Sequence, residues 1–86
     1  MKIIFTDHAK VKFEILKRHG FEVSEKKVRD IIKNPETKSK GRKERFIVQG
    51  SVDDTHVVRV IFEIEGNTIK IITFYPARRD RYENQL

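Results

Sequence analysis

The chain has 86 residues, enough for one domain with a single thin hydrophobic core. It contains no cysteine, which excludes disulfides, cysteine-ligated metal sites and thiol nucleophiles. Its 19 Lys and Arg residues against 13 Asp and Glu give a formal net charge of +6, which favours an anionic partner: RNA, DNA, an acidic protein or a membrane surface.

The N-terminal segment is predicted to form a short strand followed by a helix. Residues 2–5 have the pattern of a strand, and Thr6 is a suitable N-cap for a helix over residues 7–19. Gly20 is placed to end that helix. Apolar residues recur within it at helical spacing. They are Ala9, Phe13 and Leu16, with Val11 and Ile15 as a second apolar pair.

A second helix is predicted over residues 24–34. Ser24 is its N-cap and Pro35 stops it. Its apolar face consists of Val28, Ile31 and Ile32. Residues 36–43 have no hydrophobic period and are predicted to be a basic loop. That loop carries Lys38, Lys40, Arg42 and Lys43.

Three strands are predicted in the second half, over residues 45–50, 55–65 and 68–75, because these runs are rich in Val, Ile and Phe. Gly66-Asn67 is typical of a two-residue hairpin turn, and residues 52–54 are predicted to close the earlier hairpin. The expected fold is one α+β domain over residues 1–86. Its two N-terminal helices pack on one face of a mostly antiparallel four-stranded sheet, in the order β-α-α-β-β-β.

The turn lengths also predict the register. They place Glu65 opposite Thr68, and Ile47 opposite Arg59. One face of the sheet is then almost wholly apolar and should carry the helices. We expect this face to contain Phe46, Val48, Val58, Val60, Phe62, Ile64, Ile69, Ile71, Thr73 and Tyr75. The opposite face is mixed and should hold Arg45, Ile47, Gln49, Val57, Arg59, Ile61, Glu63, Lys70, Ile72 and Phe74, with Arg45 and Arg59 near each other at its centre.

Arginines are the most informative residues of the second half. Residues 41–86 hold six Arg and two Lys, and the planar guanidinium is suited to bidentate contacts with phosphate. Arg59 lies inside an apolar strand, where an unpaired charge is costly. Two interpretations are open for it: a phosphate ligand, or a salt bridge on the sheet with Glu63 or Glu44 as partner.

The segment from Tyr75 to Tyr82 combines three arginines, Arg78, Arg79 and Arg81, with two tyrosines. Aromatic rings stack on bases while guanidinium groups hold phosphates, so the segment has the composition of an RNA-binding tail. The alternative is an ordinary solvated C-terminus with a partly buried tyrosine.

His8 is the candidate general acid or base. It falls in the first turn of the first helix, beside Asp7 and one turn before Lys12. The alternative is a capping or packing residue. No spacing among His8, His19 and His56 is typical of a metal site, and no cofactor-binding motif is present, so we expect no cofactor. No signal peptide or membrane span is predicted, and the expected location is cytoplasmic.

Two parts of the chain resemble a known family. The run from Arg59 to Ile64, followed by residues 71–82, resembles the C-terminal half of RelE/ParE-superfamily toxins. Residues 6–9 followed by Lys12, with Asn34-Pro35 after the second helix, resemble the start of a small family related to them and to BrnT-type toxins. The resemblance implies a RelE-like fold and a toxin of a type II toxin–antitoxin system, paired with an antitoxin protein.

The resemblance further implies cleavage of RNA without metal, by attack of the ribose 2′-hydroxyl on the adjacent phosphate. Ribosome-bound mRNA is one such substrate. By position, Arg59 would neutralise the phosphate, Arg78 or Arg79 would stabilise the transition state, and Tyr82 would transfer a proton or stack on a base. Lys43 or Arg45 would supply further basic contacts, together with Lys12, Tyr75 and Arg81.

Some relatives act on gyrase instead, and His8 has no equivalent in the ribosome-dependent toxins. The competing interpretation is a non-catalytic basic module that binds a protein or a nucleic acid. Oligomeric state stays open, with a homodimer as one option.

Overall fold

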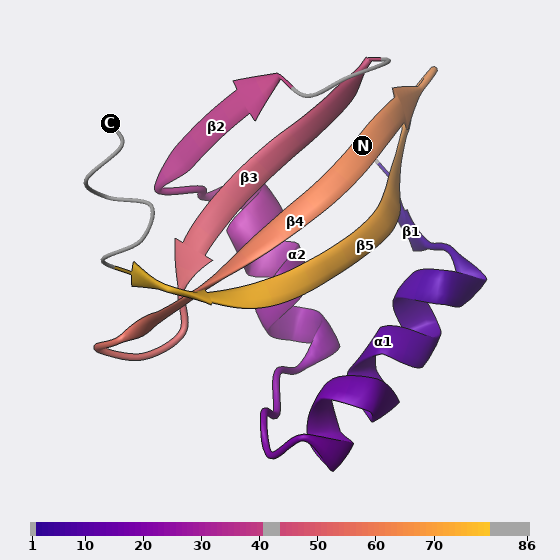
Figure 1. Cartoon of the computed structure of the whole chain (residues 1–86). Helices are drawn as coiled ribbons and strands as arrows, with labels where there is room; N and C mark the ends of the chain where they lie inside the picture. Colours follow the sequence, from indigo (N-terminus) through magenta and orange to yellow (C-terminus); the bar gives the residue numbers. More distant parts are fainter. Residues whose placement is uncertain (1, 41–43, 80–86) are drawn as a thin grey trace.

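The computed structural model describes residues 2–40 and 44–79, which fold into an α+β domain (Figure 1). The elements in chain order are β1 (Lys2–Phe5), α1 (Asp7–Arg18), α2 (Glu25–Lys33), β2 (Thr37–Lys40), β3 (Arg45–Ser51), β4 (His56–Glu65) and β5 (Thr68–Arg78). Both helices lie on one side of the sheet, as predicted, and within the described residues no helix lies on the other side (Figure 1). We call the side opposite the helices the open face. No helix among the described residues is long and apolar enough to cross a membrane.

Both helices begin where their capping residues predict. The Oγ1 atom of Thr6 accepts a hydrogen bond from the backbone N–H of Ala9 at 3.1 Å. The Oγ atom of Ser24 does the same for Lys27 at 3.0 Å. Each side chain thereby satisfies one of the N–H groups that have no partner in the first turn of a helix. Gly20 adopts a φ of +81° just after α1, a conformation that glycine adopts without strain.

Within the described residues the sheet has five strands, in the order β1-β5-β4-β3-β2, so the predicted four-stranded sheet is wrong. The additional strand, β2, lies in the segment predicted to be a loop. Its sequence, Thr-Lys-Ser-Lys, lacks the apolar alternation that identifies a half-buried strand, because it is an exposed edge strand held by backbone pairing to β3. The sheet is also mixed, since β1 pairs parallel to β5 while the other neighbours are antiparallel.

The hairpin between β3 and β4 is longer than predicted. Ser51 pairs with Val57, not with Thr55, and this brings Gln49 opposite Arg59 and Glu63 opposite Arg45. A shift of two residues keeps every side chain on its predicted face. The shift does move the two arginines apart. Arg45 lies four residues from Gln49, the register partner of Arg59, which is about 13 Å along the strand. The expected proximity of Arg45 and Arg59 is therefore wrong.

The hairpin between β4 and β5 has the predicted turn but contains a β-bulge. Glu65 pairs with Thr68 as expected, whereas Phe62 pairs with Ile71 and Ile61 pairs with Thr73. Ile72 is the extra residue. Beyond it the alternation is reversed, so the predicted faces of Thr73, Phe74 and Tyr75 are wrong. Phe74 lies on the helix side and is fully buried, and Tyr75 lies on the open face.

Thr6 anchors the bulge. Its backbone N–H donates to the carbonyl of Ile71 at 3.1 Å, and its hydroxyl donates to the carbonyl of Ile72 at 3.1 Å. The same hydroxyl oxygen caps α1, so one residue joins the end of β1, the start of α1 and the irregular point of β5.

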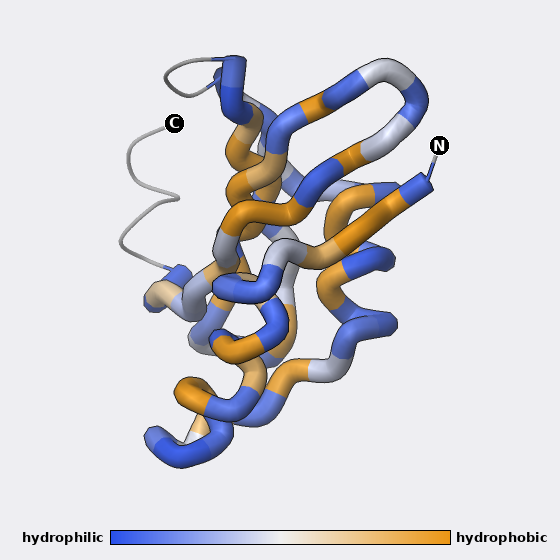
Figure 2. The backbone as a smooth tube through the Cα atoms, turned by 90° about the vertical axis from the view of Figure 1, so that its right-hand side faces the viewer, coloured by the Kyte–Doolittle hydropathy of each residue, from blue (hydrophilic) through white to orange (hydrophobic). Residues whose placement is uncertain are grey.

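The core fills the space between the helices and the covered face of the sheet. Phe13 on α1 packs against Phe74, with ring centroids 4.6 Å apart, and against Phe5 at 5.7 Å. Hydrophobic and hydrophilic residues alternate along the helices and along much of the sheet (Figure 2). The buried residues of this core are Phe5, Ala9, Leu16, Val28, Ile31, Val48, Val58, Val60, Phe62, Ile71 and Phe74. The expected burial of Val60, Phe62 and Ile71 is confirmed. Phe46 is only half-buried, stacked on Phe62 and covered by the Lys38 ammonium.

Candidate functional site on the open sheet face

Arg59 lies at the centre of the candidate site. Its neighbours on β4, Val58 and Val60, are fully buried on the helix side, so strand alternation directs the Arg59 side chain to the open face. Its register partners on the two adjacent strands are Gln49 on β3 and Tyr75 on β5. Both partners contact the guanidinium. Nη1 donates to Gln49 Oε1 at 2.9 Å, and Nε donates to Tyr75 Oη at 3.2 Å.

These two contacts orient the guanidinium from the strands on either side of β4. Their acceptors are the amide oxygen of Gln49 and the phenol oxygen of Tyr75. The sequence indicated Arg59 and Tyr75 but not the role of Gln49. The available signal was the register partner of Arg59 on β3, and identifying that partner as Gln49 required the correct length of the β3–β4 hairpin.

A salt bridge lies at the other end of the same face. Arg45 Nε donates to Glu63 Oε1 at 3.0 Å, across the β3–β4 pair. Glu63, one of the structural partners considered for Arg59, therefore contacts Arg45. Both side chains are partly exposed, and such an exposed pair contributes only about 0–1 kcal/mol to stability.

The two described arginines at the end of β5 differ from each other in their surroundings. Arg79 donates its backbone N–H to Thr55 O at 2.8 Å, and its Nη2 atom lies 3.4 Å from Glu36 Oε1. Arg78 is exposed, and its register partner on β4 is His56. It lies three residues beyond Tyr75, about 10 Å along the strand from the level of Arg59.

His8 and Lys12 lie on α1, in the helix layer. The helices lie on one side of the sheet (Figure 1), and strand alternation directs Arg59 to the other side. The fold therefore does not bring the candidate acid–base residue to the candidate phosphate ligand. Lys43, Arg81 and Tyr82 lie outside the described residues.

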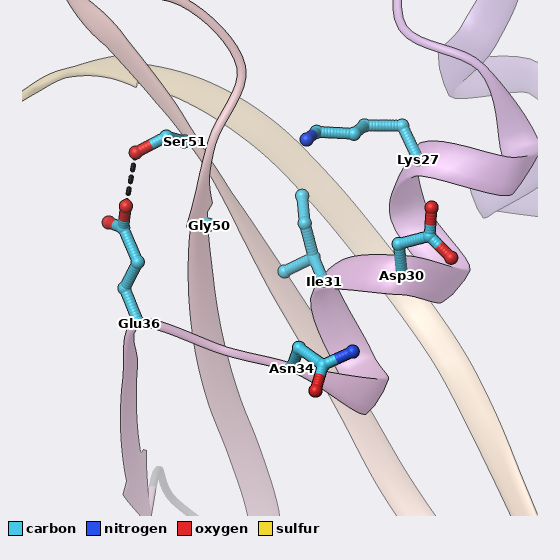
Figure 3. A pocket seen from close by; sticks show the side chains of 7 residues that line it. All are labelled: Lys27, Asp30, Ile31, Asn34, Glu36, Gly50 and Ser51. Carbon is cyan, nitrogen blue, oxygen red and sulfur yellow. Dashed lines mark hydrogen bonds between the residues drawn. The ribbon is translucent and has the colours of Figure 1, made fainter.

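The helix side of the molecule has a hollow of about 370 Å³ between α2, the segment that follows it and the end of β3. Lys27, Asp30, Asn34 and Glu36 surround it, so its charges are mixed (Figure 3). Ser51 Oγ donates to Glu36 at its rim. Ile31 points from α2 toward Gly50. A Cβ atom at position 50 would lie only 2.6 Å from Ile31 Cγ1, so the Ile31 side chain occupies the space that a larger residue would need. This hollow does not gather cations, in contrast to an anion site.

Comparison with known protein families, curated proteins and solved structures finds no match for this chain. The resemblance to RelE-like toxins therefore stays a hypothesis about fold and activity, and the site is interpreted from its own chemistry.

Proposed function

We propose that this protein binds RNA through the open face, with Arg59 as the principal phosphate ligand. The observation that carries the proposal is the placement of Arg59 between Gln49 and Tyr75, where two side chains from neighbouring strands orient its guanidinium on the face opposite the helices. A half-buried, oriented cation attracts an anion more strongly than a solvated one, because the surrounding dielectric constant is lower.

Other features of the molecule support RNA as the anion. The net charge of +6 favours encounter with a polyanion. Tyr75 places an aromatic ring beside the guanidinium, and an aromatic ring next to an arginine can stack on an unpaired base while the arginine holds the adjacent phosphate.

In line with the family resemblance, we further propose that the protein is the toxin of a toxin–antitoxin pair and cleaves the bound RNA. In that reaction the 2′-hydroxyl attacks the phosphorus, the bond to the 5′-oxygen breaks, and Arg59 stabilises the charge on the phosphoryl oxygens. The second candidate function is RNA binding without cleavage. The separation of His8 from Arg59 favours it, because a proton-transferring group must lie within hydrogen-bond reach of the reacting atoms.

The test compares the wild-type protein with Arg59→Lys. The lysine keeps the charge but lacks the fork that Gln49 and Tyr75 orient, so we expect at least a tenfold loss of affinity for a fluorescein-labelled single-stranded RNA measured by anisotropy. Arg45→Lys is the matched control, since Arg45 already pairs with Glu63, and it should lose less than about threefold.

Equal affinity of wild type and Arg59→Lys would contradict the proposal. The same samples report on the reaction class, because cleavage by the 2′-hydroxyl leaves a 2′,3′-cyclic phosphate that is detected by mass spectrometry. Intact RNA after prolonged incubation would favour the binding-only function.

A further inference from the structure

The helix side of the molecule also has a smaller hollow, between α1 and the start of α2. Its volume is about 250 Å³, and it is lined by Phe5 on β1, Lys10 and Phe13 on α1, and Glu25 on α2. Since a water molecule takes up about 30 Å³ in the liquid, this space accepts a molecule of roughly eight to ten non-hydrogen atoms. A single amino acid has that size, whereas a nucleotide is too large.

The floor of this hollow is aromatic. The ring centroids of Phe5 and Phe13 lie 5.7 Å apart, and the two rings meet at 51°. Phe5 is buried and Phe13 is half-buried, so the core fixes both rings while they line the hollow. An apolar side chain that covers these rings gains free energy in proportion to the apolar area it removes from water.

The two helices contribute opposite charges to the walls. Lys10 lies three residues before Phe13, which makes the two side chains neighbours on the surface of α1. Glu25, the first residue of α2, forms the other wall. The hollow therefore presents an ammonium and a carboxylate on either side of an apolar floor.

Arg29 holds the Glu25 carboxylate at the edge of this floor. Its Nη2 atom donates to Glu25 Oε1 at 2.9 Å, one turn along α2. The guanidinium lies over Phe5, 5.1 Å from the ring centroid, and Nη1 donates to Ile3 O at 3.3 Å, so this side chain also joins α2 to β1. A carboxylate has two oxygens, and the second oxygen of Glu25 can accept a hydrogen bond from a ligand.

We propose that this hollow binds a free apolar α-amino acid of the size of leucine. Its carboxylate pairs with Lys10, whose flexible four-carbon stem lets the ammonium follow the ligand. Its ammonium pairs with Glu25 Oε2, and its side chain covers Phe5 and Phe13. The zwitterion matches both walls at once, which is the charge complementarity that selects it. The site lies on the side of the sheet opposite Arg59, so the proposal is independent of RNA binding.

The test titrates isotopically labelled protein with L-leucine and follows the backbone amides and the Phe13 ring by NMR. We expect saturable shifts centred on Lys10, Phe13 and Glu25. The expected dissociation constant is about 0.1–1 mM, because so small a ligand makes few contacts. Shifts that do not saturate or do not occur up to about 20 mM leucine, well above that range, would overturn the proposal.

Leucine analogues test recognition of the zwitterion. Isocaproate lacks the ammonium and isoamylamine lacks the carboxylate, so each leaves one wall unmatched and should bind about fivefold more weakly than leucine. N-acetyl-leucinamide keeps the side chain without either charge and stands for a leucine within a peptide. If it binds as tightly as leucine, the hollow is a docking site for a peptide segment and the proposal is wrong.

Two variants, Lys10→Met and Glu25→Gln, test the walls. Each removes one charge at an exposed position and keeps a side chain of similar length, so the fold is retained and leucine binding should weaken about threefold or more. Lys17→Met is the matched control, since Lys17 lies two turns further along α1 and does not line the hollow; it should change the affinity less than about 1.5-fold. If either wall variant binds leucine as the control does, the proposed charge recognition is wrong.

Discussion

At the scale of single residues, Asp53 shows how one carboxylate closes a loop. Its Oδ1 atom accepts from the backbone N–H groups of Thr55 and His56, at 2.8 and 2.7 Å, and contacts the side chains of both. Each of these bonds favours the ionised form. The hydrogen bond from the Thr55 N–H is the largest cause that lowers the pKa of Asp53 from 3.8 to about 2, against an opposing effect of partial desolvation.

This pKa shift predicts a pH dependence of stability. A carboxyl with a lower pKa in the folded state stabilises the protein fully above the unfolded-state pKa of 3.8, and this contribution is lost as the pH falls toward about 2. We expect Asp53→Asn to melt at a lower temperature than wild type between pH 5 and 7. The difference should shrink steadily as the pH falls from about 4 to about 2. A difference in melting temperature that stays constant over that range would mean that the charge of Asp53 is not what closes the loop.

At the scale of elements, the β-bulge in β5 decides which aromatic side chain enters the core. Local sequence patterns predict the helices, the Gly66-Asn67 turn and the side of β3 and β4 that faces the core. They do not predict the bulge. The extra residue, Ile72, is as apolar as its neighbours, and its place is set by hydrogen bonds from Thr6, which is 66 residues away in the sequence.

The same limit applies to the edge strand β2 and to the β3–β4 register. Neither is encoded in hydrophobic spacing: β2 is held by its backbone pairing to β3, and the longer loop is closed by Asp53. The sequence therefore predicts the correct face for Arg59. Identifying Gln49 and Tyr75 as its two hydrogen-bond partners required the observed register of β3, β4 and β5.

Alanine substitutions at neighbouring positions test the bulge. Phe74→Ala should cost about 3–5 kcal/mol in the free energy of unfolding, because Phe74 is fully buried against Phe13. Tyr75→Ala should cost about 1 kcal/mol or less, since Tyr75 lies on the open face. Urea denaturation measures both. A larger loss of stability for Tyr75→Ala than for Phe74→Ala would contradict the bulge and support the regular register, in which Tyr75 faces the core.

At the scale of the whole molecule, the sheet divides the basic residues into two populations. The lysines of α1 and α2 lie in the helix layer, and Arg45 and Arg59 lie on the open face. Either population could attract RNA at long range, because net charge acts over distances of about a Debye length, roughly 8–10 Å at physiological salt. On the open face, Arg59 is oriented beside the ring of Tyr75. On the helix side, Arg29 lies over the ring of Phe5 but forms an ion pair with Glu25, so we expect close contact with RNA on the open face.

The most direct test is therefore the location of the RNA contact on the folded protein. Isotopically labelled protein is titrated with a short single-stranded RNA, and chemical-shift changes are followed for the backbone amides and for the Arg59 Nε–H. The changes should centre on Gln49, Arg59 and Tyr75 and should be small on α1 and α2. Changes centred on His8 and Lys12, with the Arg59 Nε–H signal unmoved, would contradict the open face as the RNA-binding site.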